Sequence, residues 1–253
     1  MVYDIQKAGL WKRIAAWMFD SILTGILAVG IAMLLSMLLG YDAYNQSVDA
    51  AYAKYEQEYG IVFEITQEEY QALAEDQRQR YQEAYDALTR DEQAMQDYRM
   101  MLNLTLVIAT AGILLAMLVW EFLIPLRLGN GQTLGKKIFG LCLVRQDGVM
   151  VNPMQLFTRT ILGKYTIETM LPLYLLILSF WGVMGLTGTL VLFALAAAQV
   201  ACIALSRQHS VIHDLLAGTV AADITSQMIF RTTEDLIAYK KKIAAEHAAR
   251  QIY

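Results

Sequence analysis

The chain has 253 residues, of which 57% are hydrophobic, and it carries a formal net charge of −4 at pH 7. Its mean hydropathy is +0.38, and its apolar residues gather in long blocks. This composition indicates a membrane protein and gives no reason to expect a nucleic-acid partner. Only two cysteines occur, Cys142 and Cys202. Two separated thiols make neither a disulfide framework nor a metal site, so we expect apolar fillers and no metal or cofactor.

Four apolar blocks predict an all-α membrane protein with four transmembrane helices, since a span needs about 20 mostly apolar residues. The first block, 17–39, is longer than a signal-peptide core and carries Asp20, and no convincing Ala-x-Ala site follows it, so we expect it to stay uncleaved. The predicted parts are an interfacial amphipathic helix at 1–16, a first span at 17–40, an extracytoplasmic helical insertion at 41–99, a second span at 100–126, a cytoplasmic signature loop at 127–165, the third and fourth spans at 166–206, and a cytoplasmic motif with a basic helical tail at 207–253.

The charges of the connecting segments predict their sides of the membrane. Residues 41–99 hold fourteen Asp and Glu against five Lys and Arg, whereas residues 127–164 hold six Lys and Arg against Asp147 alone. Basic residues also mark the N-terminal segment and the tail. Because cytoplasmic loops carry the excess of Lys and Arg, we predict both termini in the cytoplasm and 41–99 outside. The expected location is the bacterial plasma membrane.

The insertion at 41–99 has the composition of helices, being rich in Tyr, Gln, Ala and Glu and free of Pro. Thr66 with Glu69, and Thr89 with Glu92, have the spacing of capping boxes that begin helices. We predict a head of about three helical segments, partly continuous with the first two spans. Its tyrosines suit a docking surface for a protein partner, but aromatic residues at helical spacing more often pack such a head against itself.

Charged residues occur at the ends of the predicted spans. Asp20 lies just inside the first block, and Arg13 is on the same helical face, roughly 10 Å away. An ionisable residue at membrane depth is costly and is read as functional; the alternative is an Asp20 at headgroup level that only caps or pairs locally. After the last span, His213 and Asp214 are adjacent. This pair suits a proton relay, because His titrates near neutral pH, but an adjacent His and Asp are usually an ordinary surface pair.

The strongest local motif follows the second span and reads GQTLGKKIFGLCLVRQDG over residues 131–148. Gly-rich sequence beside Lys suggests a phosphate-binding loop. The P-loop spacing fails, however, and Lys136 is not followed by Ser or Thr, so ATP binding is not expected. Residues 138–144 and 149–151 resemble two short strands joined by a tight turn at Asp147. We therefore predict a β-hairpin-like loop at the membrane surface.

Together these motifs resemble the RDD family of bacterial integral membrane proteins, which is named for one Arg and two Asp residues. The opening motif is Arg13-x-x-Ala16-x-x-x-Asp20, and Glu121 stands where an acidic residue often ends the second span. The central motif supplies Gly131, Thr133, Gly135, Lys136, Gly140 and Asp147, with Arg159 after it. The closing motif is His213-Asp214-x-x-Ala217-Gly218-Thr219. The resemblance covers 7–40 and 100–223 and leaves out the insertion and the tail from 224.

The resemblance implies a fold more than a function. Some RDD proteins are thought to exchange monovalent cations for protons, and Arg13, Asp20, Glu121 and Asp214 suit such a role. The same residues suit a static ion-pair network that fastens helices together. In either case we expect all four to meet at the cytoplasmic membrane boundary.

Two functions therefore remain open. The first is a transport-related protein that handles a small cation or a proton; four spans hardly enclose a path, so transport favours a homo-oligomer. The second is a non-transporting scaffold, or an accessory or immunity protein, that docks a partner through 41–99. We do not expect an enzyme, because no nucleophile–base set such as Ser-His-Asp is visible.

Overall fold

The computed structural model describes residues 5–6, 8–180, 182–206 and 210–250. Parts of the predicted interfacial helix and of the predicted tail, at 1–4, 7, 207–209 and 251–253, lie outside the described residues. Among the described residues, four helices are long and apolar enough to cross a membrane: Leu10–Leu39, Glu92–Leu128, Pro153–Phe180 and Gly185–Leu205. The predicted all-α membrane fold with four such helices is confirmed.

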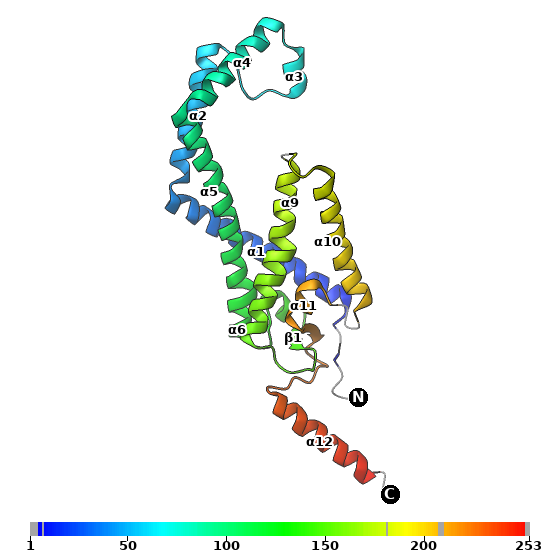
Figure 1. Cartoon of the computed structure of the whole chain (residues 1–253). Coiled ribbons are helices and arrows are strands. Elements are labelled where there is room, and N and C mark those ends of the chain that lie inside the picture. The colour runs from blue at the N-terminus through cyan, green and yellow to red at the C-terminus, as the bar shows by residue number, and fades with distance from the viewer. Residues whose placement is uncertain (1–4, 7, 181, 207–209, 251–253) are drawn as a thin grey trace. The chain divides into compact units, whose positions relative to one another are not determined.

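The chain divides into two compact units, Met1–Ala28 with Ile113–Tyr253, and Val29–Gly112. The first unit holds the start of α1 (Leu10–Leu39), the end of α5 (Glu92–Met117), η1 (Leu118–Leu123), α6 (Ile124–Leu128), α7 (Leu134–Ile138), β1 (Leu141–Arg145), α8 (Pro153–Phe157), η2 (Thr158–Met170), α9 (Leu171–Phe180), α10 (Gly185–Leu205), α11 (Ile212–Ala217), β2 (Thr219–Asp223) and α12 (Thr233–Arg250). In this unit α9 and α10 run side by side (Figure 1).

The third membrane helix begins earlier than the sequence predicted. Asn152 caps α8, because its side chain accepts a hydrogen bond from the backbone of Gln155 at 2.8 Å, and Pro153 fills the first helical position. The chain then continues through η2, a helix of wide π-type turns, into α9. Residues 153–165 are therefore helical, and the predicted loop at 127–165 is wrong over this part. The charges of Arg159 and Lys164 suggest a loop in the sequence, but in the structure these side chains pair with carboxylates on other helices instead of facing water.

A two-stranded sheet joins the central and closing motifs. β1 and β2 are antiparallel, with Leu141 opposite Asp223 and Arg145 opposite Thr219. The predicted hairpin is reduced to a single bridge between residues 144 and 150. The segment after the turn cannot extend this pairing, because α8 begins at residue 153. The main partner of β1 is thus a strand about 75 residues later in the chain, as the register shows.

The two cysteines occupy different environments. Cys142 lies in β1 and is fully buried, packed with Val144 and Ala222. Burial raises the pKa of the Cys142 thiol to about 11, so the thiol is protonated at neutral pH. Cys202 is partly buried in α10. Cys142 therefore packs as a small apolar side chain, as the sequence predicted.

The N-terminal segment differs from the predicted interfacial helix at 1–16. Helix α1 begins at Leu10 and continues unbroken, whereas the described residues before it, Ile5, Gln6, Ala8 and Gly9, are not helical. The backbone N–H of Asp223 at the end of β2 donates to the carbonyl of Gln6 at 3.0 Å. This segment therefore lies along the sheet instead of forming a separate helix.

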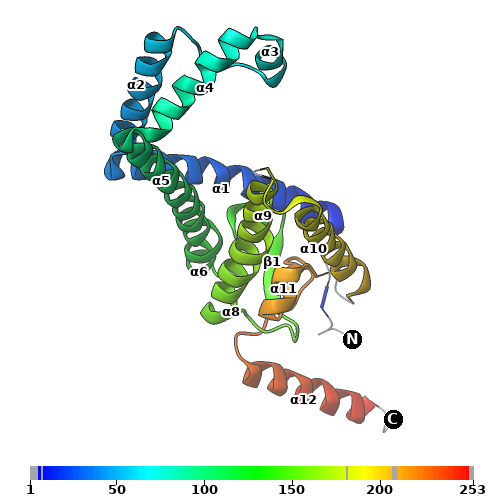
Figure 2. The ribbon, with the colours of Figure 1, turned by 45° about the horizontal axis from the view of Figure 1, so that its top comes forward.

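The second unit contains the insertion, whose helices are α2 (Tyr41–Tyr59), α3 (Gln67–Ala72), α4 (Glu75–Arg90) and the start of α5. Within it, α2 and α4 lie side by side (Figure 2). The capping box of Thr66 and Glu69 is present as predicted. The predicted box at Thr89 is wrong, because Thr89 donates to carbonyls of its own helix, and Asp91 accepts from the backbone of Ala94 at 3.1 Å instead. An Asp at that position caps the new helix directly.

Candidate functional site

Asp20 is buried in α1, and its two carboxylate oxygens have different partners. Oδ1 accepts hydrogen bonds from the indole of Trp120 at 3.1 Å and from the backbone N–H of Gly135 at 2.9 Å. Oδ2 accepts one from the hydroxyl of Thr133, which also caps α7, and Nζ of Lys136 lies 4.0 Å from this oxygen. The central motif thus folds into a loop and the start of a helix, and this segment binds Asp20 of the opening motif.

Glu121 lies in η1 among three cationic side chains. Its Oε1 accepts a hydrogen bond from Lys164, and its Oε2 lies 3.5 Å from Arg159 and 3.6 Å from Lys136. Oε2 is buried and accepts no hydrogen bond from the described residues. The hydroxyl of Thr160 donates to the backbone carbonyl of Glu121 at 3.1 Å, which ties η2 to η1 at this level.

Asp214 is the acidic residue of the closing motif and is fully buried in α11. Its Oδ1 accepts hydrogen bonds from Arg159 at 2.8 Å and from Thr219 at 3.1 Å, and Arg13 lies 3.8 Å from Oδ2. Burial by itself would raise the pKa of Asp214, but the neighbouring cations hold that pKa well below its usual range. Asp214 is therefore a carboxylate at neutral pH and connects α1 to η2.

His213 is held in a defined tautomer between an acid and a base. Its Nε2 lies 2.9 Å from a guanidinium nitrogen of Arg159, and its Nδ1 lies 2.7 Å from Oε2 of Glu168. Arginine can only donate, so Nε2 accepts, and the imidazole proton is on Nδ1 and is donated to Glu168. Burial and the charge of Arg159 lower the pKa of His213, which favours the neutral ring. Both ring nitrogens are thus engaged in structural hydrogen bonds.

Lys136 lies in α7, outside the membrane helices, and its surroundings disfavour the charged form of its ammonium. Burial lowers the pKa of Lys136 to about 8; the charges of Arg159 and Lys164 add to this effect, and Glu121 opposes it. The Lys136 ammonium makes one hydrogen bond within 3.5 Å among the described residues, to the hydroxyl of Thr133 at 3.1 Å.

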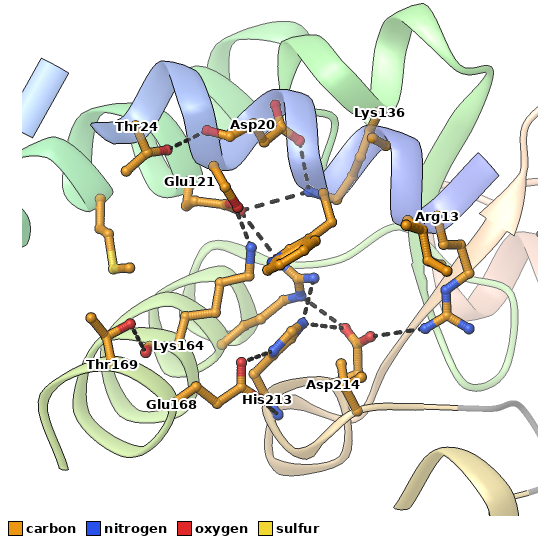
Figure 3. A pocket seen from close by; sticks show the side chains of 18 of the residues that line it. Arg13, Asp20, Thr24, Glu121, Lys136, Lys164, Glu168, Thr169, His213 and Asp214 are labelled. Atoms are coloured by element: carbon orange, nitrogen blue, oxygen red, sulfur yellow. Dashed lines mark hydrogen bonds and ion pairs between the residues drawn. The ribbon is translucent and has the colours of Figure 1, made fainter. Parts of the chain in front are cut away.

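These side chains line a cavity of about 690 Å³ within the first unit (Figure 3). In Figure 3, Lys136 and Lys164 extend toward Glu121 from different elements, while Arg13 and His213 flank Asp214. The charged lining consists of four bases and four acids: Arg13, Lys136, Arg159, Lys164, Asp20, Glu121, Glu168 and Asp214. With His213 neutral, the formal charge of this set is zero. Most of the remaining lining is apolar and comes largely from α1 and α5.

The structure brings the predicted charged residues together. Arg13, Asp20, Glu121, His213 and Asp214 all line the cavity. Arg13 on α1 forms an ion pair with Asp214 of the closing motif, which lies on α11. The structure thus brings Arg13, Asp20, Glu121 and Asp214 together around one cavity, and their location at the cytoplasmic boundary stays a prediction.

The predicted signature residues divide into two groups. Thr133, Gly135, Lys136 and Arg159 reach the charged site. The others, Gly131, Gly140 and Asp147, lie at the turns that flank β1. Gly131 has a φ of +61°, and a Cβ there would lie 2.6 Å from Cβ of Leu143, while Asp147 pairs with Arg145 at 2.8 Å. This second group shapes the strand and does not contact the cavity.

Three important residues were not predicted as part of the site. Glu168 holds His213, Trp120 donates to Asp20, and Lys164 neutralises Glu121. The sequence offered one signal for the first of these: Lys164 and Glu168 are four residues apart and would share a helical face. This spacing indicates a shared face only if both residues lie in one helix. The predicted span began at 166 and left Lys164 in a loop, so the spacing could not be used.

The fold and the buried site define a multi-pass membrane protein whose helices are joined by an internal network of charges. Comparison with protein families identifies it more closely: the model of the RDD family matches residues 7–218, so the chain belongs to the RDD family. Searches among curated proteins and among solved structures found no match.

Proposed function

We propose that this protein exchanges a small monovalent cation for a proton across the bacterial plasma membrane. The observation that carries the proposal is the cavity among the membrane helices, into which four carboxylates and four bases project. Ionisable residues within membrane spans are rare and costly, and they are found along ion pathways and in proton relays. No covalent chemistry enters this role, so we propose a protein that is not an enzyme.

The balance of charge favours exchange over one-way passage. The charged lining sums to zero, so a cation that enters would leave the buried cluster with an uncompensated charge, which is costly in a medium of low dielectric constant. If a proton leaves as the cation enters, the cluster stays neutral. We propose a homo-oligomer as the functional unit, because four membrane spans are too few to enclose a path for an ion.

Ion flux in sealed proteoliposomes tests this function. We expect a pH gradient to drive uptake of Na⁺, K⁺ or Li⁺, and an imposed cation gradient to drive proton movement, both absent from protein-free vesicles. Glu121→Gln should abolish the flux, while Glu83→Gln, an exposed change in the insertion, should retain it. Absence of coupled flux in well-folded wild-type protein contradicts the proposal.

A second candidate is a scaffold that docks a protein through the insertion. It is favoured by the separate compact unit at 29–112 and by the exposed side chains of Val62 and Tyr85 on it. Replacing 45–97 by a short Gly/Ser linker should leave a membrane-inserted, monodisperse protein. Loss of a co-purifying partner from this variant, with flux absent from both proteins, would favour the scaffold over the exchanger.

A further inference from the structure

We propose that Lys136 carries the proton that leaves when a cation enters the cavity. This inference rests on the proposed cation–proton exchange and deepens it by naming the exchanged proton. In the exchange, one N–H bond of the Lys136 ammonium breaks, the nitrogen keeps the electron pair, and the proton passes to bulk water. The entering cation supplies the positive charge that Lys136 has lost, so the total charge of the cavity lining is unchanged.

The four acids that line the cavity in the described part of the chain have no proton to release. Both oxygens of Asp20 accept hydrogen bonds, and so do both oxygens of Glu168, as only ionised carboxylates do. Glu121 accepts a hydrogen bond from one lysine and faces two further cations. Asp214 is ionised, because its cationic neighbours hold its pKa well below the usual range in spite of its burial. The proton must therefore come from a base.

Among the bases of the lining, Lys136 is the one whose proton can leave. A guanidinium is not deprotonated in proteins, which excludes Arg13 and Arg159. The ring of His213 is neutral, because burial and the charge of Arg159 lower its pKa, and its remaining N–H is held in a hydrogen bond. Lys164 donates directly to a carboxylate, and this charge-assisted hydrogen bond holds its ammonium in the charged form. Lys136 donates to a neutral hydroxyl instead.

The position of Lys136 couples its charge to two acids of the cavity. Its Nζ lies between carboxylates from two elements, 3.6 Å from Oε2 of Glu121 in η1 and 4.0 Å from Oδ2 of Asp20 in α1 (Figure 3). When Lys136 loses its proton, the charged lining changes from zero to one net negative charge. A cation in the cavity then restores neutrality through space, since charges interact strongly in a medium of low dielectric constant. It does not need to contact the buried Oε2 of Glu121.

The charges around Lys136 bring its proton loss close to neutral pH. The pKa of Lys136 is lowered to about 8, mainly by burial; Glu121 and Asp20 oppose this effect, and Arg159 and Lys164, which face the ammonium from η2, add to it. A cation in the cavity repels the ammonium and lowers this pKa further. By linkage, loss of the proton strengthens cation binding to the same extent. Cation affinity should therefore rise with pH up to about 8 and level off above it.

Proton release on cation binding tests this assignment without a flux measurement. Na⁺ would be added to the purified full-length protein in detergent and weak buffer, with a pH indicator to count protons and calorimetry to measure the Kd for Na⁺. We expect about one proton released per bound Na⁺ at pH 7, almost none at pH 10, and a Kd that rises about tenfold for each pH unit below 7. A Kd that is independent of pH, or one that titrates only at about pH 4–6.5 as carboxylates and His do, would overturn the assignment. This arm needs no variant.

Two substitutions of Lys136 distinguish a proton carrier from a structural cation. Lys136→Arg keeps the charge but cannot lose it, so it should lose Na⁺ binding and release no proton. Lys136→Met has no charge to lose, so it should bind Na⁺ with the same Kd from pH 6 to 10 and release no proton. Lys137→Arg, at the exposed neighbouring position, is the matched control and should behave as wild type.

The outcomes separate this assignment from the proposed function. If wild-type protein shows coupled ion flux while Lys136→Arg releases protons as wild type does, or Lys136→Met keeps the wild-type pH dependence, another group carries the proton and the exchange itself stands. If wild-type protein shows neither flux nor proton release with Na⁺, the exchange is refuted, and the assignment of Lys136 is refuted with it.

Discussion

Gly135 and Asp20 are in direct contact, although 115 positions separate them: the backbone N–H of Gly135 donates to Oδ1 of Asp20 at 2.9 Å. A Cβ at position 135 would lie 2.8 Å from that carboxylate and 2.6 Å from the carbonyl of Ala16. The second glycine of the central motif is thus required by the close approach of α7 to α1. The two residues of this contact come from the opening and central motifs, so the contact joins these two motifs in the folded protein.

The first prediction concerns this approach. Gly135→Ala should destabilise the protein by about 1–3 kcal/mol, the usual cost of overpacking, because the added methyl group forces α7 away from Asp20. The measurement is thermal or denaturant unfolding in detergent. Gly30→Ala is the matched control, since nothing lies within 4 Å of a Cβ there, and it should be neutral or slightly stabilising. Equal stability of the two variants would show that α7 does not need the close contact.

The second prediction concerns the Asp20 carboxylate. Asp20→Asn keeps the shape but places an amide N–H₂ against donors that now bind a carboxylate oxygen. We expect a loss of about 3 kcal/mol or more, because a buried donor left without an acceptor costs its full desolvation energy. Ser21→Ala, at an exposed neighbouring position, should change the unfolding midpoint little. A variant as stable as wild type would indicate an Asp20 that is solvated in the membrane-embedded protein.

The sequence predicted the members of the charge network better than their pairing. Hydropathy and charge position placed Asp20, Glu121 and Asp214 at span ends, and each of these residues lines the cavity. The actual partners depend on tertiary geometry: Asp20 is held mainly by neutral donors, and Glu121 by a base from the third helix. A pattern within one helix carries no information about which side chain of another helix faces it.

The same limit explains the two main corrections to the fold. The segment at 153–165 looks like a loop because Arg159 and Lys164 are charged, yet each finds a buried carboxylate, so the helix extends through it. The sequence pattern predicts that the strand at 138–144 pairs with its neighbour at 149–151, whereas the observed strand at 141–145 pairs with 219–223. In both cases the stabilising partner lies far away in the chain and only the folded protein reveals it.

The third prediction is a dependence of stability on pH that arises from His213. Its pKa in the folded protein lies below its ordinary value of 6.5, so the unfolded chain binds the proton first as the pH falls. Stability should therefore decrease below about pH 6.5, by at most about 1.4 kcal/mol per pH unit. His213→Gln should flatten this dependence between pH 6.5 and 5.5, and His247→Gln, exposed on α12, should leave it unchanged. A flat wild-type profile in this window would contradict the neutral, buried imidazole.

The last prediction concerns sidedness. The excess of basic residues in the N-terminal segment, the central motif and the tail predicts that these parts face the cytoplasm and that 41–99 faces outward. In a background with Cys142→Ala and Cys202→Ala, single cysteines would be introduced as Gln46→Cys and Lys241→Cys, both at exposed positions. A membrane-impermeant maleimide applied to intact cells should label position 46, and position 241 should react only after permeabilisation. Permeabilised cells serve as the control that both thiols are accessible. Labelling of 241 but not 46 in intact cells would reverse the topology and place the charged cavity at the opposite face of the membrane.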